Sequence, residues 1–361
     1  MELNLIWRLH GILFLSFLTA ALLTPLLRWI AFQLGVLDHP KEHGIHLHPV
    51  PRLGGVALYA AFVAGSLYRM DLSEMLKGVL VASSIIFFIG LADDLIHLRA
   101  SLKLVGQLVA CAIMMFRYGV ILNVFPNLFL NGFFTALGLI GITNAVNFLD
   151  NMDGLASGLV MISSLAIFIV ATTTKQFWLA YLSAALVGSC AGFLVFNLKK
   201  AHVFMGDAGS TFLGFTLASL AVMTEWSYHL SVTLAVPLLI LGVPVLDMFL
   251  ITVLRIKEGK VRNFKEWIDY TGKDHFSHRL MRLGLGKRGA VFFLWSLQAV
   301  FSGVALLILP RKPEWGVVGL VFFSLAALSI TAFFRKRRAL ALQFSSRAPK
   351  RKEAPASRGK R

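Results

Sequence analysis

Residues 184–223 read AALVGSCAGFLVFNLKKAHVFMGDAGSTFLGFTLASLAVM, which is two apolar runs joined by a short polar stretch. An apolar run of about 17–25 residues is long enough to cross the hydrocarbon of a bilayer as a helix. The polar stretch holds Asp207, flanked by Gly206 and Gly209, and then Ser210. The sequence therefore predicts two membrane helices whose connection places a carboxylate at one surface.

The same alternation of apolar runs and polar loops continues along the chain. Of its 361 residues, 57% are hydrophobic and 15% are charged, whereas a soluble domain carries about 25% charged residues. Eleven runs are candidate spans, or ten if the short fourth and fifth are one: 7–33, 53–68, 78–92, 102–117, 131–146, 155–172, 177–196, 210–224, 230–254, 289–309 and 315–334. These runs predict an all-α polytopic membrane protein with a single domain over residues 1–334.

Positive charge gathers in alternate loops. The net charge is +17, and all but eight of the 35 lysines and arginines lie in or beside the loops of one face. Those segments are 35–52, 92–101, 147–154, 197–209, 255–288 and a basic tail, 335–361, expected to be disordered. The positive-inside rule places them in the cytoplasm and the N-terminus outside. This distribution argues against nucleic acid as a partner; the tail either contacts anionic headgroups or only sets topology.

The third predicted span ends in two adjacent carboxylates, Asp93 and Asp94. Ionisable groups at membrane depth are costly and are functional by default, although a solvated helix end is an equally simple explanation. Lys103 and Gln107 lie one turn apart on the next span and are placed to meet these carboxylates or a phosphate.

A second polar loop reads NAVNFLDNMDG and carries Asn144, Asn147, Asp150 and Asp153 at steps of three. Those steps put the four side chains along one helical face. They are oxygen donors, which suit Mg²⁺ or Mn²⁺ better than zinc. The alternative is an asparagine-capped break between helices.

The opening loop adds Asp207 as another oxygen ligand and Phe204 as an aromatic face for stacking. Because residues 207–210 begin the eighth span, free N–H groups there are placed to hold an anion. A capped helix start explains Asp207 and Ser210 as well, but it does not explain Phe204.

Histidines and arginines occupy two further loops of this face. DHFSHRL provides His275, His278 and Arg279, and HLHPVPRLGG provides His46 and Arg52. His275 and His278 have a spacing that can chelate zinc, but the cationic neighbours favour an anionic ligand such as a diphosphate. Proximity to lipid headgroups explains the cations of the first loop equally well. Together, the five loops indicate metal-assisted phosphoryl transfer at a membrane surface, with a lipid as one substrate.

Five motifs, in order and on one face, resemble the polyprenyl-phosphate N-acetylhexosamine-1-phosphate transferase superfamily: HLHPVPRLGG, GLADDL with KLVGQ, NAVNFLDNMDGLASG, VFMGDAGSTFLGF and DHFSHRL. The resemblance implies a multi-pass protein of the cell (inner) membrane with a cytoplasmic active site. It also implies transfer of a sugar-1-phosphate from a UDP-sugar to undecaprenyl or another polyprenyl phosphate, which releases UMP.

The resemblance further implies roles for individual residues. Asp93, Asp94, Asp150 and Asp153 are expected to be catalytic, and Asn147 and Asp207 to hold Mg²⁺, with Mn²⁺ as a substitute. Substrate binding is expected from Lys103, Asn144, Phe204, His46, Arg52, His275, His278 and Arg279.

Departures from the superfamily pattern bear on the sugar. Ser277 stands where a histidine is common, and Arg279 and PRLGG match the branch that uses UDP-N-acetylglucosamine. The alternative within the superfamily is the phospho-N-acetylmuramoyl-pentapeptide transferase of peptidoglycan synthesis. A secondary transporter is the rival class, but transporter sites lie near the bilayer midplane. The sequence leaves open a homodimer, and direct attack by the lipid phosphate against an aspartyl intermediate.

Overall fold

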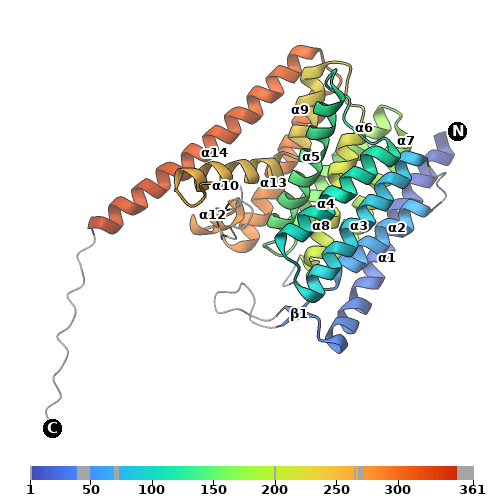
Figure 1. Ribbon diagram of the computed structural model, residues 1–361, viewed down its shortest axis with the longest axis horizontal. Helices are drawn as coiled ribbons and strands as arrows, with labels where there is room; N and C mark the ends of the chain where they lie inside the picture. Colours follow the sequence, from blue (N-terminus) through green and yellow to red (C-terminus); the bar gives the residue numbers. More distant parts are fainter. Residues whose placement is uncertain are drawn as a thin grey trace, which may run out of the picture.

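A computed structural model describes residues 2–38, 49–68, 73–198, 201–263, 266, 272 and 274–347, with side chains from residue 5 to residue 336. Most of these residues are helical (Figure 1). The elements are α1 (Glu2–Leu34), β1 (Leu37–Asp38), β2 (Val50–Pro51), α2 (Gly54–Leu67), α3 (Glu74–Ile96), α4 (Ala100–Ala112), a π-helical turn η1 (Ile113–Arg117), α5 (Leu128–Leu149), α6 (Leu155–Thr173), α7 (Phe177–Asn197), α8 (Gly206–Met223), α9 (Leu230–Ile240), α10 (Gly242–Lys257), α12 (Phe276–Arg282), α13 (Lys287–Ile308) and α14 (Pro313–Arg347).

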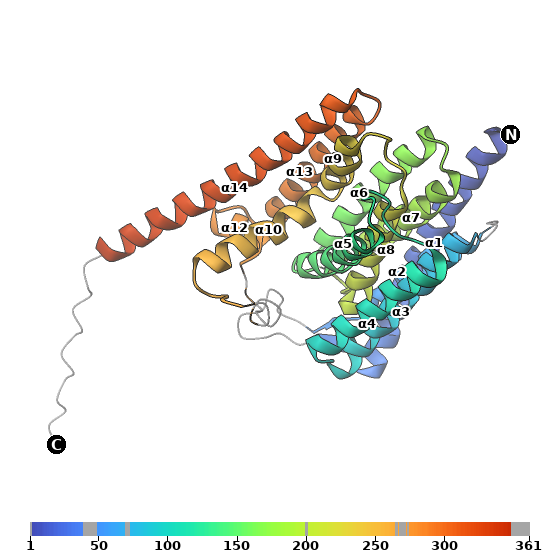
Figure 2. The same ribbon diagram turned by 45° about the horizontal axis from the view of Figure 1, so that its top comes forward.

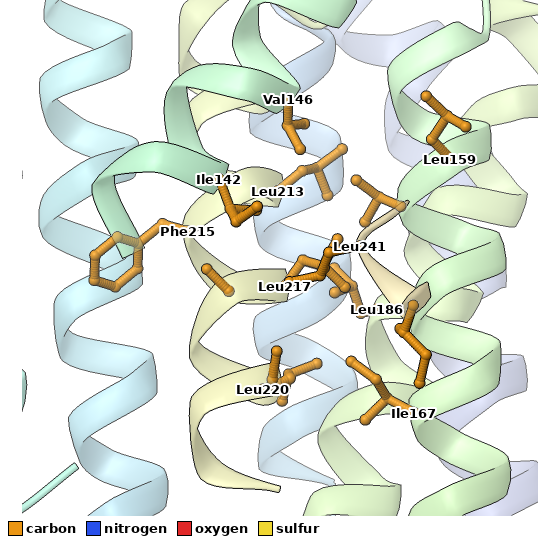
Figure 3. Packing of buried hydrophobic residues seen from close by; sticks show 14 of the residues in the cluster. Ile142, Val146, Leu159, Ile167, Leu186, Leu213, Phe215, Leu217, Leu220 and Leu241 are labelled. Carbon is orange, nitrogen blue, oxygen red and sulfur yellow. The ribbon is translucent and has the colours of Figure 1, made fainter. Parts of the chain in front are cut away.

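Helix α8 lies at the centre of the bundle and packs against α2, α3, α5 and α6. Its residues from Ala208 to Ala221 are all buried. Figure 3 shows Leu213, Leu217 and Leu220 of α8 directed toward leucine, isoleucine and valine side chains of the neighbouring helices. A helix surrounded by protein needs no lipid-facing apolar surface, so α8 can carry glycine, serine and threonine along its length.

Eight described helices are long and apolar enough to cross a membrane, and nine are if the bent pair α9–α10 counts as one span. The chain is therefore an all-α, multi-pass membrane protein. All eleven predicted runs form helices, but the predicted count of ten or eleven spans is higher than this measure supports. The physical reason is that α2 has only 14 residues, and α8 is the buried, polar-rich helix described above.

The run 230–254, predicted as one span, is broken. Helices α9 and α10 meet at an 83° bend between Ile240 and Gly242. Gln298 of α13 fills the break: its side-chain oxygen accepts from the N–H of Val243 (2.9 Å), and its side-chain nitrogen donates to the carbonyl of Ile240 (2.7 Å). Ser163 donates to the same carbonyl at 2.7 Å. These contacts satisfy backbone groups that the bend removes from the helical ladder.

Helix α14 is one continuous element of 35 residues that packs on α9, α10 and α13. Figures 1 and 2 show its C-terminal part projecting past α12, away from the bundle. The predicted disordered tail therefore begins later than residue 335, because the helix continues through Arg347. Residues 348–361 lie outside the described residues.

Candidate active site

The five polar loops meet at one end of the bundle, because successive helices return the chain to that end. Hydrogen bonds join them in sequence-distant pairs: the Phe204 N–H to the Pro51 carbonyl (2.8 Å), the Gly154 N–H to Asn197 (2.9 Å), the Ala201 N–H to Asp153 (3.2 Å) and the Ser277 hydroxyl to Asn151 (2.8 Å). The predicted convergence of these loops is thus a property of the fold.

Asp94 connects the end of α3 to the start of α8. Its two carboxylate oxygens accept from the N–H groups of Asp207 (2.9 Å) and Ala208 (3.0 Å), and the residue is 9% exposed. The N-terminal amides of a helix favour an anion, and here the anion belongs to the protein. The anion expected at these amides is therefore the carboxylate of Asp94.

The position of Gly206 depends on the same contact. Gly206 has a φ of +67°, and a Cβ added there would lie 2.8 Å from the carboxyl carbon of Asp94. Glycine provides both the left-handed backbone and the space for the carboxylate. Asp207 does not cap α8 with its side chain, so the helix-cap alternative for Asp207 is wrong.

Lys103 of α4 joins two of the predicted acidic residues. Its ammonium donates to Asp93 at 2.9 Å and to Asp207 at 2.8 Å. Asp93 also accepts from the N–H of Leu98 (2.7 Å), just after α3 ends. The Asp207 side chain is 30% exposed and that of Lys103 is 27% exposed, so the pair can be reached from outside the bundle. Carboxylates of α3 and α8 thus share one ammonium from α4.

Asn147 and Asp150 lie at the end of α5, which also packs against α8. The hydroxyl of Ser210 in α8 donates to the side-chain oxygen of Asn147 at 2.7 Å. Removal from water and the charge of three other carboxylates raise the pKa of Asp150 to about 8; the three are Asp207, Asp94 and Asp153. Arg52 opposes this effect. Crowded carboxylates of this kind create a negative field that a bound cation would relieve.

The four residues at steps of three do not share one helical face. Helix α5 ends at Leu149, and the chain turns through Gly154, whose φ is +74°, before α6. Asn144 exchanges amide hydrogen bonds with Gln107 of α4, at 2.9 and 3.3 Å. Asp153 accepts from the N–H of Ala201. Asn144 therefore ties α4 to α5, and Asp153 ties the α5–α6 turn to the loop before α8.

The first loop contributes Arg52 and a two-stranded pairing. β1 and β2 are antiparallel, with Leu37 opposite Pro51, and Arg52 pairs with Asp38 at 2.8 Å. The backbone of Phe204 joins this unit, because its carbonyl accepts from the N–H of Gly54 (3.0 Å). The Phe204 side chain is half-buried. His46 lies outside the described residues.

Two arginines, Arg255 and Arg279, bind Asp274 in the connection between α10 and α13. Arg255 pairs with Asp274 through two hydrogen bonds, at 2.6 and 3.0 Å, and both residues are buried. Burial alone would raise the pKa of Asp274, but the hydrogen bonds and charge of Arg255 outweigh it and lower that pKa. Arg279 is 8% exposed; it donates to the Asp274 carbonyl (2.7 Å) and lies over the ring of Phe334. Arg279 therefore contacts both the segment before α12 and helix α14, which is a structural role.

His275 is buried and packs against Phe148, with ring centroids 5.4 Å apart. Its Nδ1 lies 2.8 Å from Asp247 of α10. His278 is half-buried on α12. The structure therefore brings His275 to the C-terminal end of α5, which carries Asn147 and is followed by Asp150.

Sequence reasoning missed two buried residues, Asn197 and Asp247. Asn197 accepts from the N–H of Gly154 and donates to the carbonyl of Val203 (2.9 Å), so it joins two of the site loops. Asp247 is fully buried within α10. A signal for Asp247 was available, because a carboxylate inside the apolar run 230–254 is costly without a specific partner.

Known proteins resemble this chain over most of its length. The family model for glycosyl transferase family 4 matches residues 76–225. A probable undecaprenyl-phosphate N-acetylglucosaminyl 1-phosphate transferase of Bacillus subtilis (strain 168) is 32% identical over 327 residues, which are 88% of this chain and 89% of that protein. This chain belongs to glycosyl transferase family 4.

Two further relatives extend the comparison. A decaprenyl-phosphate N-acetylglucosaminephosphotransferase of Mycobacterium leprae (strain TN) is 30% identical, over 88% of this chain and 90% of that protein. An undecaprenyl-phosphate alpha-N-acetylglucosaminyl 1-phosphate transferase of Salmonella typhi is 27% identical, over 86% of each. The segment matched by the family model runs from α3 through α8 and so contains the acidic cluster and Lys103.

Proposed function

We propose that this protein transfers N-acetylglucosamine-1-phosphate from a UDP-sugar to a polyprenyl phosphate, yielding polyprenyl-diphospho-N-acetylglucosamine and UMP. The observation that carries the proposal is the cluster in which Lys103 joins Asp93 and Asp207 at one end of a membrane bundle. The names of the relatives above support the choice of a polyprenyl phosphate as acceptor and of N-acetylglucosamine-1-phosphate as the group transferred.

The proposed reaction forms one oxygen–phosphorus bond and breaks another. An oxygen of the lipid phosphate attacks the β-phosphorus of the UDP-sugar, and the bond between the β-phosphorus and the bridging oxygen breaks, so that UMP leaves with the bonding electrons. Two anions must meet, which is strongly unfavourable where the dielectric constant is low. Lys103 provides a positive charge beside Asp93 and Asp207, and Arg52 lies close enough to act on Asp150.

A divalent cation fits the donor set of Asp207 and Asn147. Both present oxygen atoms, and neighbouring carboxylates raise the pKa of Asp150. Among the residues with described positions, no three His, Cys, Asp or Glu form a complete metal cage. Mg²⁺ is usually held by one or two carboxylates together with substrate phosphates and water. When bound, Mg²⁺ would neutralise charge on the diphosphate.

Asp94 acts in this proposal by positioning Asp207. Both of its oxygens accept from amides of α8, so its carboxylate fixes the position of Asp207 in the first turn of the helix. Asp93 and Asp207 are better placed to touch substrate or cation, because they share the accessible ammonium of Lys103. Asp150 and Asp153 border the same end of α5, and Phe204 offers a half-buried ring for a uracil base.

The site faces the cytoplasm in this proposal, and the N-terminus lies outside the cell membrane. All but eight of the 35 lysines and arginines lie in or beside the loops at the site end. Positive loops remain on the cytoplasmic side during insertion, where a water-soluble UDP-sugar is available.

A choice of donors tests the proposal. Purified protein, undecaprenyl phosphate and Mg²⁺ are mixed with UDP-N-acetylglucosamine or with UDP-N-acetylmuramoyl-pentapeptide, each labelled in the sugar. We expect labelled lipid and UMP from the first donor. Product from the second donor alone would show that the sugar is wrong, and product from neither would refute the transferase. Asp207→Asn should be inactive, while Glu225→Gln, a matched change beyond the other end of α8, should remain active.

A further inference from the structure

Asp247 is a buried carboxylate that the proposed chemistry does not use. It lies in α10, just after the 83° bend, and is 0% exposed. Its Oδ2 lies 2.8 Å from Nδ1 of His275, and its Oδ1 accepts from the N–H of Phe276 at 2.6 Å. A buried carboxylate is costly unless its oxygens are satisfied. Both oxygens are therefore directed at the start of α12.

The contact with Asp247 determines which nitrogen of His275 can serve a ligand. A carboxylate accepts a hydrogen bond, so Nδ1 must carry the proton and donate. Nε2 is then the nitrogen left for a ligand. The ring packs on Phe148, the residue after Asn147, so this nitrogen belongs to a ring held at the C-terminal end of α5 in the proposed site.

The connection between α10 and α13 has separate structural supports. Arg255 and Asp274 form a buried two-bond pair, and the Ser277 hydroxyl donates to Asn151 at 2.8 Å. These contacts already join α12 to α10 and to the α5–α6 turn. What the carboxylate of Asp247 adds is its contact with the His275 ring, which fixes the orientation of the ring and keeps a proton on Nδ1.

We infer that Asp247 is a positioning residue: it holds His275 with Nδ1–H donated to its carboxylate, so that Nε2, which carries a proton when the anionic diphosphate of the sugar donor is bound, donates to a diphosphate oxygen. This inference rests on the proposed function. A carboxylate behind a histidine plays this part in several kinds of site: it fixes the tautomer and orients the ring. Loss of such a partner behind a metal-bound histidine costs about 10–100-fold in activity or affinity.

Asp247→Asn tests the inference because asparagine keeps the shape of the side chain. Its oxygen can still accept from the N–H of Phe276, but its NH₂ group then faces Nδ1 and cannot accept a proton from it, so the ring can no longer donate from both nitrogens. We expect kcat/KM for the UDP-sugar to fall about 10–100-fold, in line with the loss of other histidine partners.

A double-mutant cycle with His275→Ala separates positioning from a structural role. If Asp247 acts through His275, Asp247→Asn should change kcat/KM less than about 3-fold in the His275→Ala background, since the two changes remove one shared function. An equal loss in both backgrounds would overturn the inference, because Asp247 would then act without His275.

A spectroscopic measurement on the wild-type protein tests the inference even if Asp247→Asn is inactive or unstable. The ¹⁵N spectrum of histidine-labelled wild-type protein, with the His275 signal assigned by its absence from His275→Ala, reports which ring nitrogen carries the proton. We expect a protonated Nδ1, and an unprotonated Nδ1 would overturn the inference. If wild-type protein makes no lipid product from any donor while Nδ1 is protonated, the proposed function fails and the pairing stands.

Discussion

Replacing Gly206 by alanine should damage the site through a single contact. Gly206 has a φ of +67°, and its added Cβ would press on the carboxylate of Asp94. That carboxylate accepts from two amides of α8 at 2.9 and 3.0 Å. The substitution therefore combines a backbone cost with displacement of the group that joins α3 to α8.

Gly119→Ala is a control that isolates the displacement. Gly119 has a φ of +70°, and a Cβ there would meet no atom within 4 Å. In both variants the new alanine must adopt the left-handed backbone conformation, which destabilises the folded state by about 1–2 kcal/mol. Only Gly206→Ala also loses one or both hydrogen bonds to a charged group, each contributing about 1.5–3 kcal/mol. The difference between the variants should thus be about 1.5–6 kcal/mol.

The two variants are compared by the free energy of unfolding in detergent and by turnover of the UDP-sugar. Gly206→Ala should be less stable than Gly119→Ala by the amount above. Its turnover should be at least about tenfold lower, since 1.4 kcal/mol in a barrier is a factor of ten. Equal stability and equal turnover would refute the view that Asp94 organises the start of α8.

Three other perturbations follow from the same contacts. Lys103→Gln should abolish turnover while the protein still purifies, because Asp93 and Asp207 then lose their shared cation; turnover near the wild-type level would exclude Lys103 from the chemistry. EDTA should stop lipid product formation and added Mg²⁺ or Mn²⁺ should restore it, whereas full activity in EDTA would contradict a metal at Asp207 and Asn147. Gln298→Leu leaves the N–H of Val243 unpaired, while the Ile240 carbonyl keeps Ser163 as a donor, and should lower the free energy of unfolding by about 1–3 kcal/mol; an unchanged midpoint in a detergent melt would contradict that function of Gln298.

The convergence of the five loops could be predicted from the sequence. Apolar runs of membrane length alternate with polar loops, so every second loop must return to the same end. Asp207 and Asp93 were therefore expected at one surface, with Lys103 beside them, and the structure joins all three. Family membership confirms the resemblance that these motifs indicated.

The contacts made by Asp94 could not be predicted. They depend on how the end of α3 sits against the start of α8, and the two segments are 113 residues apart. Periodicity assigns residues to helices, but it does not set the rotation or depth of one helix against another. The steps of three from Asn144 to Asp153 misled for a related reason, since the helix ends at Leu149 before the pattern is complete.

The break in the run 230–254 had local signals that hydropathy does not weigh. Pro237, Gly242 and Pro244 weaken the helix, and Asp247 follows within one turn. A hydropathy profile sums apolar side chains and does not detect a bend. A membrane helix can bend where other helices satisfy the freed backbone groups. The partner that does so, Gln298, lies in α13 and has no pattern in sequence that links it to the bend.

The fate of the β-phosphorus tests the central claim most directly. UDP-N-acetylglucosamine labelled with ³²P in the β-phosphate is incubated with the purified protein, undecaprenyl phosphate and Mg²⁺, and the lipid and nucleotide products are separated. Transfer of a sugar-1-phosphate predicts that the label enters the lipid and that the released nucleotide is unlabelled UMP. Label that leaves as UDP, with an unlabelled lipid-linked sugar, would contradict the account, because the bond broken would then be the one between sugar and phosphate.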